Sequence, residues 1–514
     1  MTTQTPPETS QAAPSDKLDR DVLLVAGVVV LGAIMSILDI TVVSVAQPTF
    51  QTEFDASPAE TAWTMTGYTL ALAAVIPLTG WAADRFGTKR LYMLAVALFT
   101  AGSVLCATAT SIEMLTAFRV LQGLGGGMLM PLGMTIMTRA AGPHRIGRVM
   151  AVLGIPMLLG PIFGPILGGW LIDVASWHWI FLINLPIGFA AVIYAALVLP
   201  KDSPTPSETF DFTGMLMLSP GLALFLFGVS SIPAEGTVWA TRVLVPAAIG
   251  LALVVLFVLR TLFRSPDHPL IDLHLFRHRP LTIAVITMSF FAIAFFGASL
   301  LFPSYFLQVR GETTLQAGIL LAPQGIGAML TMPIAGILTD KIGPGRIVLA
   351  GIVTIVVGMS MFTQVGVDTS YTYLLGALFV MGMGMGGTMM PIMTSALQSL
   401  KDAEIARGST LMNITQQVSA SIGTALFSVI LTNGFNASDA VGALRAALER
   451  PEGVASLRDP SILPRALADM ADAFGTAFTV AAILVAACLI PALLLPRRKA
   501  PVPDAGAEAP VLMH

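Results

Sequence analysis

Residues 77–90 read PLTGWAADRFGTKR, and residues 333–346 read PIAGILTDKIGPGR. In both stretches Pro, Gly, Asp, a basic residue, Gly and Arg stand at matching positions, and every matching pair is separated by 256 residues. The simpler explanation is that Gly, Asp and Arg are common in tight loops. Because six positions share one offset, we instead infer two homologous halves with additional sequence between them.

The composition indicates that most of the chain lies in a lipid bilayer. Of its 514 residues, 55% are apolar and only 11% are charged, whereas a soluble protein of this size carries about 25% charged residues. The 27 Lys and Arg residues nearly balance the 30 Asp and Glu residues. This balance excludes a strongly basic nucleic-acid-binding protein.

Fourteen apolar runs are long enough to cross a membrane as helices, which takes about 20 residues each. A helix satisfies its own backbone hydrogen bonds in lipid, and the runs are too long for barrel strands. The predicted fold class is therefore an all-α polytopic membrane protein. The runs lie near residues 22–46, 60–82, 91–110, 112–138, 146–172, 178–199, 212–233, 238–261, 280–307, 313–338, 346–367, 371–397, 408–433 and 473–496.

The repeat and the runs together predict two six-helix bundles with two inserted central helices. The expected segments are a disordered cytoplasmic tail (1–21), an N-terminal bundle (22–199), the inserted helices with cytoplasmic linkers (200–279), a C-terminal bundle (280–496) with an extracytoplasmic loop (434–472), and a cytoplasmic tail (497–514).

Basic residues predict the orientation. With the N-terminus inside, 20 of the 27 Lys and Arg residues lie in inner loops and tails and six in outer loops, while Arg119 lies within a span. Positive charge favours the cytoplasmic side. Four of the six outer residues belong to the 434–472 loop, and long loops cross largely regardless of charge. Both termini are therefore expected in the cytoplasm, on a multi-pass protein of the plasma (inner) membrane.

Two charged residues lie within the body of the predicted spans, Asp39 in the first and Arg119 in the fourth. A charge at the membrane centre costs about 2.5–3.5 kcal/mol on insertion scales, so both are functional candidates. The helical rise places both roughly 10 Å below the outer boundary. If both face the central cavity, their pairing would link proton binding at Asp39 to substrate binding or conformational change. The alternative is that each only joins neighbouring helices.

Five further residues are candidates for contacting a substrate. Gln122 lies one turn beyond Arg119 in the fourth span, where it could also extend a polar relay. Asn413, Gln416 and Gln417 bring three amides into the thirteenth span. Amides are costly to expose to lipid. Met385 belongs to a Met-rich segment, and Met suits surfaces that bind varied apolar shapes. For all five the alternative is packing between helices.

The fifth span combines glycines with prolines. Three glycines recur every fourth residue and form a face on which another helix can lie close, while prolines can bend the axis. Such a seam would suit two halves that rock against each other, although plain packing would also explain it. The candidate residues are Gly154, Pro156, Gly160, Pro161, Gly164, Pro165 and Gly168.

These motifs resemble signatures of the major facilitator superfamily, and specifically of its fourteen-helix drug:proton antiporters of the EmrB/QacA type. Residues 80–90 resemble the loop between helices two and three, apart from Thr88, where a basic residue is common. Residues 38–43 resemble the acidic motif of helix one, residues 119–123 the basic motif of helix four, and residues 154–169 the antiporter motif of helix five. The resemblance implies the major facilitator fold and a role for Arg119 in proton handling.

The repeated inner loop is a candidate gate. A carboxylate at Asp84 can meet the positive N-terminal end of a helix from the other half. The resemblance implies that this partner is helix thirteen, near Arg407, and that Asp340 with Lys341 forms a weaker counterpart. The candidate gating residues are Gly80, Asp84, Arg85, Gly87, Arg90 and Asp340.

The sequence contains no phosphate-binding loop, His-Glu-x-x-His motif or cysteine cluster, so no enzyme activity, metal or cofactor is predicted. The resemblance implies a secondary active multidrug efflux transporter that exports hydrophobic or cationic compounds in exchange for protons by alternating access. Some relatives use a periplasmic adaptor protein as a partner. The alternatives are a proton-coupled or facilitative importer of a small nutrient or metabolite, and a membrane scaffold.

Overall fold

The computed structural model describes residues 19–142, 145–201, 210–235, 237–264, 269–401, 404–448, 459 and 461–497. Most of the two predicted tails and part of the 434–472 loop lie outside these residues. The same holds for the side chains of Pro156, Pro161 and Pro165.

All the regular elements among the described residues of the first half are helices. Its elements are α1 (Arg20–Val45), α2 (Gln47–Glu53), α3 (Pro58–Phe86), α4 (Thr88–Ala107), α5 (Ile112–Ala141), α6 (Ile146–Val174), α7 (Trp179–Leu182) and α8 (Asn184–Val198). The inserted segment follows as α9 (Phe212–Ser230), α10 (Ile232–Glu235) and α11 (Thr241–Arg264).

The second half repeats this pattern with more interruptions. The 3-10 helix η1 (Leu273–Arg277) precedes it, and the π-helix η2 (Ala292–Phe296) lies within it. Its α-helices are α12 (Arg279–Phe291), α13 (Gly297–Ser299), α14 (Leu301–Gln308), α15 (Thr314–Leu320), α16 (Ala322–Ile342), α17 (Pro344–Met361), α18 (Tyr371–Gly386), α19 (Met389–Leu397), α20 (Ile405–Asn436), α21 (Asp439–Leu448), α22 (Ile462–Ala487) and α23 (Leu489–Ala492).

Thirteen helical segments within the described chain are long and apolar enough to cross a membrane. They match thirteen of the fourteen predicted spans, and α6 occupies the position of the remaining one, the fifth. One boundary differs clearly, because α22 begins at Ile462 and not near residue 473. The helix therefore extends into the segment that we assigned to the 434–472 loop.

The second long helix of each half is defined by matching caps. Ser57 and Glu60 form a capping box at the start of α3, and Thr313 and Gln316 form one at the start of α15, which leads into α16. These two boxes are again 256 residues apart. Both α3 and α16 end at a glycine with positive φ, 94° at Gly87 and 90° at Gly343, a conformation that glycine adopts without strain. The repeat therefore extends beyond the fourteen residues in which the sequence showed it.

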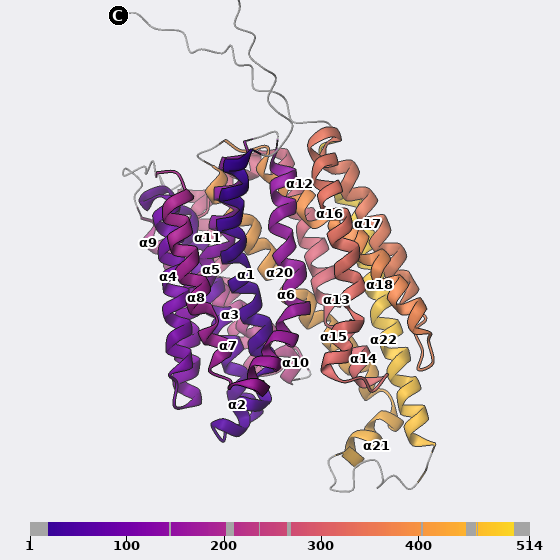
Figure 1. Ribbon diagram of the computed structural model, residues 1–514. Coiled ribbons are helices and arrows are strands. Elements are labelled where there is room, and N and C mark those ends of the chain that lie inside the picture. The colour runs from indigo at the N-terminus through magenta and orange to yellow at the C-terminus, as the bar shows by residue number, and fades with distance from the viewer. Residues whose placement is uncertain are drawn as a thin grey trace, which may run out of the picture.

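The two halves lie side by side as bundles, the first indigo to magenta and the second orange to yellow (Figure 1). They meet along two seams, where α6 packs on α16 and where α20 packs on α3 and α5. The start of α1 and the end of α22 lie at one end of the molecule, and α21 lies at the other (Figure 1).

The inserted helices α9 and α11 pack on each other and cover the α3–α20 seam. Aromatic pairs hold α9 and the residues just before it against α3. Trp63 stacks on Phe227 with ring centroids 5.4 Å apart, and the ring centroids of Trp81 and Phe210 are 4.4 Å apart. On the other side, aliphatic residues of the inserted segment pack against Ala425 of α20.

The sequence suggested that the glycine face of α6 lies at a seam between the two halves. In the structure, this face contacts a helix of its own half. An added Cβ at Gly160, Gly164 or Gly168 would meet Ile37, Thr41 or Val42 of α1, within the same half. The contact with the other half uses Gly147 and Gly154. At 3.6 residues per turn, Gly154 and Gly160 point about 120° apart, which explains why one helix serves two neighbours.

We expect Gly164→Ala to destabilise the protein by about 1–3 kcal/mol, the usual cost of overpacking. The new Cβ would lie 1.9 Å from the Thr41 hydroxyl oxygen, so α1 would have to shift. Gly169→Ala is a control on the same helix, because an added Cβ there meets nothing within 4 Å. Thermal unfolding of the purified variants measures both effects, and equal stabilities would contradict the prediction.

Candidate functional site

Asp39 and Arg119 form an ion pair inside the first half. The Arg119 Nη1 atom lies 2.5 Å from the Asp39 Oδ2 atom. Asp39 on α1 is 2% exposed and Arg119 on α5 is completely buried. The two charged residues that the sequence singled out are therefore in direct contact.

Gln122 completes a closed network with this pair. Its Oε1 atom accepts a hydrogen bond from Arg119 Nη1 at 2.7 Å, and its Nε2 atom donates to Asp39 Oδ1 at 2.7 Å. Both carboxylate oxygens of Asp39 thus accept hydrogen bonds. Because Gln122 is fully buried and both ends of its amide are used, the geometry fits the polar relay that the sequence suggested for it.

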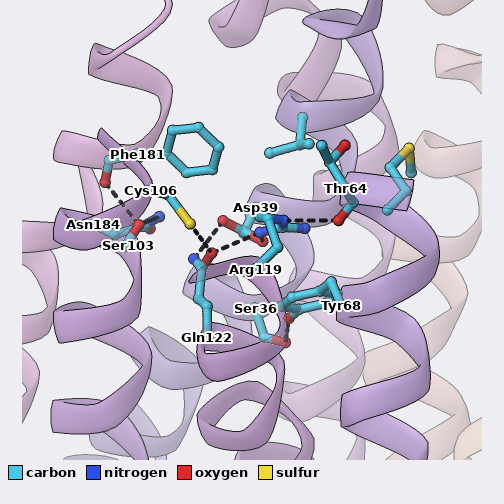
Figure 2. A network of polar contacts seen from close by, with 12 residues as sticks. Ser36, Asp39, Thr64, Tyr68, Ser103, Cys106, Arg119, Gln122, Phe181 and Asn184 are labelled. Carbon is cyan, nitrogen blue, oxygen red and sulfur yellow. Dashed lines mark hydrogen bonds and ion pairs between the residues drawn. The ribbon is translucent and has the colours of Figure 1, made fainter. Parts of the chain in front are cut away.

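Side chains from several helices surround the network (Figure 2). Arg119 Nε donates to the Thr64 carbonyl at 3.2 Å, and the guanidinium carbon lies 4.1 Å from the centre of the Tyr68 ring and 5.9 Å from that of Phe181. The Cys106 thiol donates to the Gln122 carbonyl at 3.6 Å. Sequence reasoning missed these residues. The signal available was that a Tyr within an apolar run needs a partner for its hydroxyl.

The network is closed to solvent in this conformation. The sequence-based hypothesis had both charges facing a central cavity. Instead, the contacts described for Asp39, Arg119 and Gln122 come from α1, α3, α4, α5 and α7, all in the first half. The ion pair is therefore a buried element of the first bundle, and water reaches it only if the bundle rearranges.

The three amides of α20 differ in the contacts that they make. Asn413 donates to the Ser409 carbonyl at 2.8 Å and contacts the Met134 sulfur of α5 at 3.1 Å. The Gln416 Oε1 atom is buried with no hydrogen-bond partner in the described structure. Gln417 lies among apolar residues of α3 and α9, and Met385 packs against the hydrophobic core. None of the contacts described for these four residues joins one of them to another.

The acid of the second repeat, Asp340, caps a helix of the first half. Its carboxylate accepts hydrogen bonds from the backbone nitrogens of Gly147 at 2.9 Å and Arg148 at 3.3 Å, at the start of α6. The Arg148 side chain also lies 3.6 Å from this carboxylate. Two backbone hydrogen bonds and an ion pair thus join Asp340 to the start of α6.

The acid of the first repeat, Asp84, meets the start of α20. Its carboxylate lies 3.6 Å from Arg407, in the first turn of α20, and 3.6 Å from Arg139 of α5. This is the helix that the family resemblance indicated. Gly80 lies in the same contact, where an added Cβ would be 3.1 Å from the Thr410 hydroxyl.

The remaining residues of the first repeat shape the turn between α3 and α4. Arg85 lies in the last turn of α3, Gly87 supplies the positive φ, and Arg90 is exposed at the start of α4. The Lys89 ammonium group donates to the carbonyls of Ala196 and Leu199, both at 2.7 Å. Lys89 thus caps the C-terminal end of α8, a favourable place for a positive charge.

The molecule consists of two homologous helical bundles that meet along two seams, and charged residues are buried inside one of them. This is the architecture of a secondary transporter of the membrane. Residues 29–424 match the profile of the Major Facilitator Superfamily. The chain belongs to this superfamily.

Named relatives and solved structures agree with this assignment. The Multidrug resistance protein B homolog of Mycobacterium tuberculosis H37Rv is 51% identical over 93% of this chain and 91% of its own length. The Multidrug export protein EmrB of Escherichia coli K12 is 30% identical over 78% of this chain and 79% of its own. The human organic anion transporter MFSD10 superposes with a TM-score of 0.59 at 16% identity, covering 91% of this chain and all of its own. The last similarity concerns the fold alone.

We expect the two single charge removals to differ in cost at neutral pH. Asp39→Asn leaves a guanidinium that cannot lose its proton, whereas Arg119→Gln leaves a carboxyl group that can become neutral by binding one. Asp39→Asn should cost about 3 kcal/mol, the low end for breaking a buried pair, because carbonyl and ring partners remain.

The double variant Asp39→Asn/Arg119→Gln should be more stable than Asp39→Asn alone. Thermal unfolding of the three purified variants tests this order. Simple addition of the two single effects would show that the charges do not depend on each other.

Proposed function

We propose that the protein is a secondary active multidrug efflux transporter that exports hydrophobic or cationic compounds in exchange for protons by alternating access. The observation that carries the proposal is the closed network of Asp39, Arg119 and Gln122 inside the first bundle. Relatives that share most of their length with this chain carry the names multidrug resistance and multidrug export proteins, which supports the substrate class.

Proton binding at Asp39 is the proposed coupling step. When the bundle opens toward the outer side, a proton from there can bind the carboxyl group. It removes the charge that balances Arg119, and an unbalanced charge is costly once the site is buried again. The first bundle then lowers its free energy by rearranging or by admitting water. When water reaches Asp39 from the cytoplasm, the carboxyl group releases its proton and the ion pair forms again.

One proton is sufficient to drive useful export. A proton that moves through 100 mV releases about 2.3 kcal/mol. Since a tenfold concentration ratio corresponds to about 1.4 kcal/mol, this energy supports a roughly fortyfold gradient of a neutral compound.

The contacts of Asp84 and Asp340 are the proposed cytoplasmic gates. Each joins the second long helix of one half to the first turn of a helix in the other. The distribution of basic residues supports placing this end in the cytoplasm. Both termini would then be cytoplasmic, in the plasma (inner) membrane, and an adaptor would meet the opposite end, which carries α21.

The proposed substrate contacts are Asn413, Gln416, Gln417 and Met385. Gln416 supports this assignment best, because its buried Oε1 atom has no hydrogen-bond partner in the described structure and an unpaired buried acceptor favours binding a donor. Asn413 reaches across to α5, so a compound between the halves would compete with that contact.

We expect Asp39→Asn to reduce proton-driven dye efflux from proteoliposomes at least tenfold, to the level that a protonophore leaves in the unaltered protein. Glu113→Gln is the control, because it removes an exposed acid from the first turn of α5 and should keep full efflux. If the Asp39→Asn variant keeps efflux that a protonophore abolishes, proton coupling uses a residue other than Asp39. Accumulation of the dye in the opposite direction would favour an importer.

Loss of the α6 cap should open the cytoplasmic end. In Asp340→Ala, we expect a cysteine placed at Ala151, which lies against Gly336 at this seam, to react several-fold faster with a maleimide added from the cytoplasmic side. Arg279→Ala, which removes an exposed charge from the first turn of α12, serves as the control. Both native cysteines are buried, so they add little background. An unchanged labelling rate in Asp340→Ala would rule out a gating role for this cap.

A further inference from the structure

Tyr68 of α3 lies directly against the buried charge network. Its side chain is 1% exposed, and the guanidinium carbon of Arg119 lies over the ring at 4.1 Å from the centroid. An aromatic face attracts a cation, and more strongly when water is excluded. Phe181 lies near the same guanidinium but farther away, at 5.9 Å.

The Tyr68 ring is held in this position by two other helices. Its hydroxyl group shares a hydrogen bond of 3.3 Å with Ser36 of α1, about one turn from Asp39. On the α5 side, the ring occupies space that Gly126 leaves open, since an added Cβ there would lie 2.6 Å from the Tyr68 hydroxyl oxygen. The ring therefore keeps its place independently of the ion pair.

Proton exchange at Asp39 leaves Arg119 without a charged partner. The guanidinium stays protonated, and Asp39 is the only carboxylate within ion-pair distance of it in the described residues. The titratable groups facing the network are Tyr68 from α3 and Cys106 from α4, while α7 contributes the Phe181 ring. The partners that remain are the Thr64 carbonyl, the Gln122 carbonyl and the aromatic faces.

We propose that Tyr68 is the positioning residue that holds Arg119 in place while Asp39 is protonated. Its ring replaces part of the attraction that the carboxylate provides, so that Arg119 does not leave the site before the proton is released. This inference rests on the proposed proton coupling, but its first test does not require transport.

The first test is a comparison of melting temperatures in which Asp39→Asn represents the protonated carboxyl group. Tyr68→Leu should lower the melting temperature at least twice as much in the Asp39→Asn protein as in the protein with Asp39. Tyr92→Leu is the matched control: Tyr92 is also fully buried and donates to the Val28 carbonyl of α1 at 2.9 Å. It should lower the temperature equally in both backgrounds. An equal effect of Tyr68→Leu in both would overturn the proposal.

The second test compares the ring with the hydroxyl group in proton-driven efflux. Tyr68→Phe keeps the aromatic face and should retain at least half of the efflux rate. Tyr68→Leu should reduce the efflux rate at least tenfold, and its remaining efflux should need a lower pH on the outer side of the membrane. Equal loss in both variants would assign the effect to the Ser36 hydrogen bond and overturn the proposal. If Asp39→Asn retains full efflux, the proposed coupling fails, and the melting temperatures still decide the role of Tyr68.

Discussion

The ion pair between Asp39 and Arg119 constrains the first half of the molecule more than any other contact. Removing two charges from water costs several kcal/mol each, and only close pairing with further hydrogen bonds offsets this cost. The groups that provide them come from α3 and α5 as well as α1. These helices cannot separate without exposing a charge to an apolar interior, so the first bundle behaves as one body while the pair is intact.

Continuous packing joins this pair to the Asp340 contact of the second half. The turn of α1 that carries Asp39 lies against the glycine face of α6, with Thr41 opposite Gly164. The first turn of the same α6 helix is capped by Asp340 from the other half. A change at Asp39 that moves α1 therefore also acts on α6, and the first turn of α6 is held by Asp340 of the second half. Side chains of α1 fill the space that these glycines leave, so the two helices are in close contact along this face.

The sequence predicted the helices from long apolar runs, and it singled out the two charged residues but gave their pairing only as a condition. Charges inside long apolar runs are few, so Asp39 and Arg119 were conspicuous, and the 256-residue repeat revealed the two halves. The neighbours of the pair were not predictable in this way, because the rotation of each helix decides whether Tyr68 or Phe181 faces Arg119. The prediction of which helix the glycine face of α6 contacts was wrong for the same reason. The early start of α22 was missed because a helix continues beyond the membrane whether or not its residues are apolar.

The inserted helices make the two seams unequal. Because α9 lies across α3 and α20, with aromatic pairs on one side and aliphatic residues on the other, lipid does not reach that seam directly. Along the opposite seam, α6 and α16 present exposed apolar side chains such as Phe163 and Ile334 to the outside. A hydrophobic molecule dissolved in the bilayer therefore has a shorter lateral approach to the interior from the α6–α16 side.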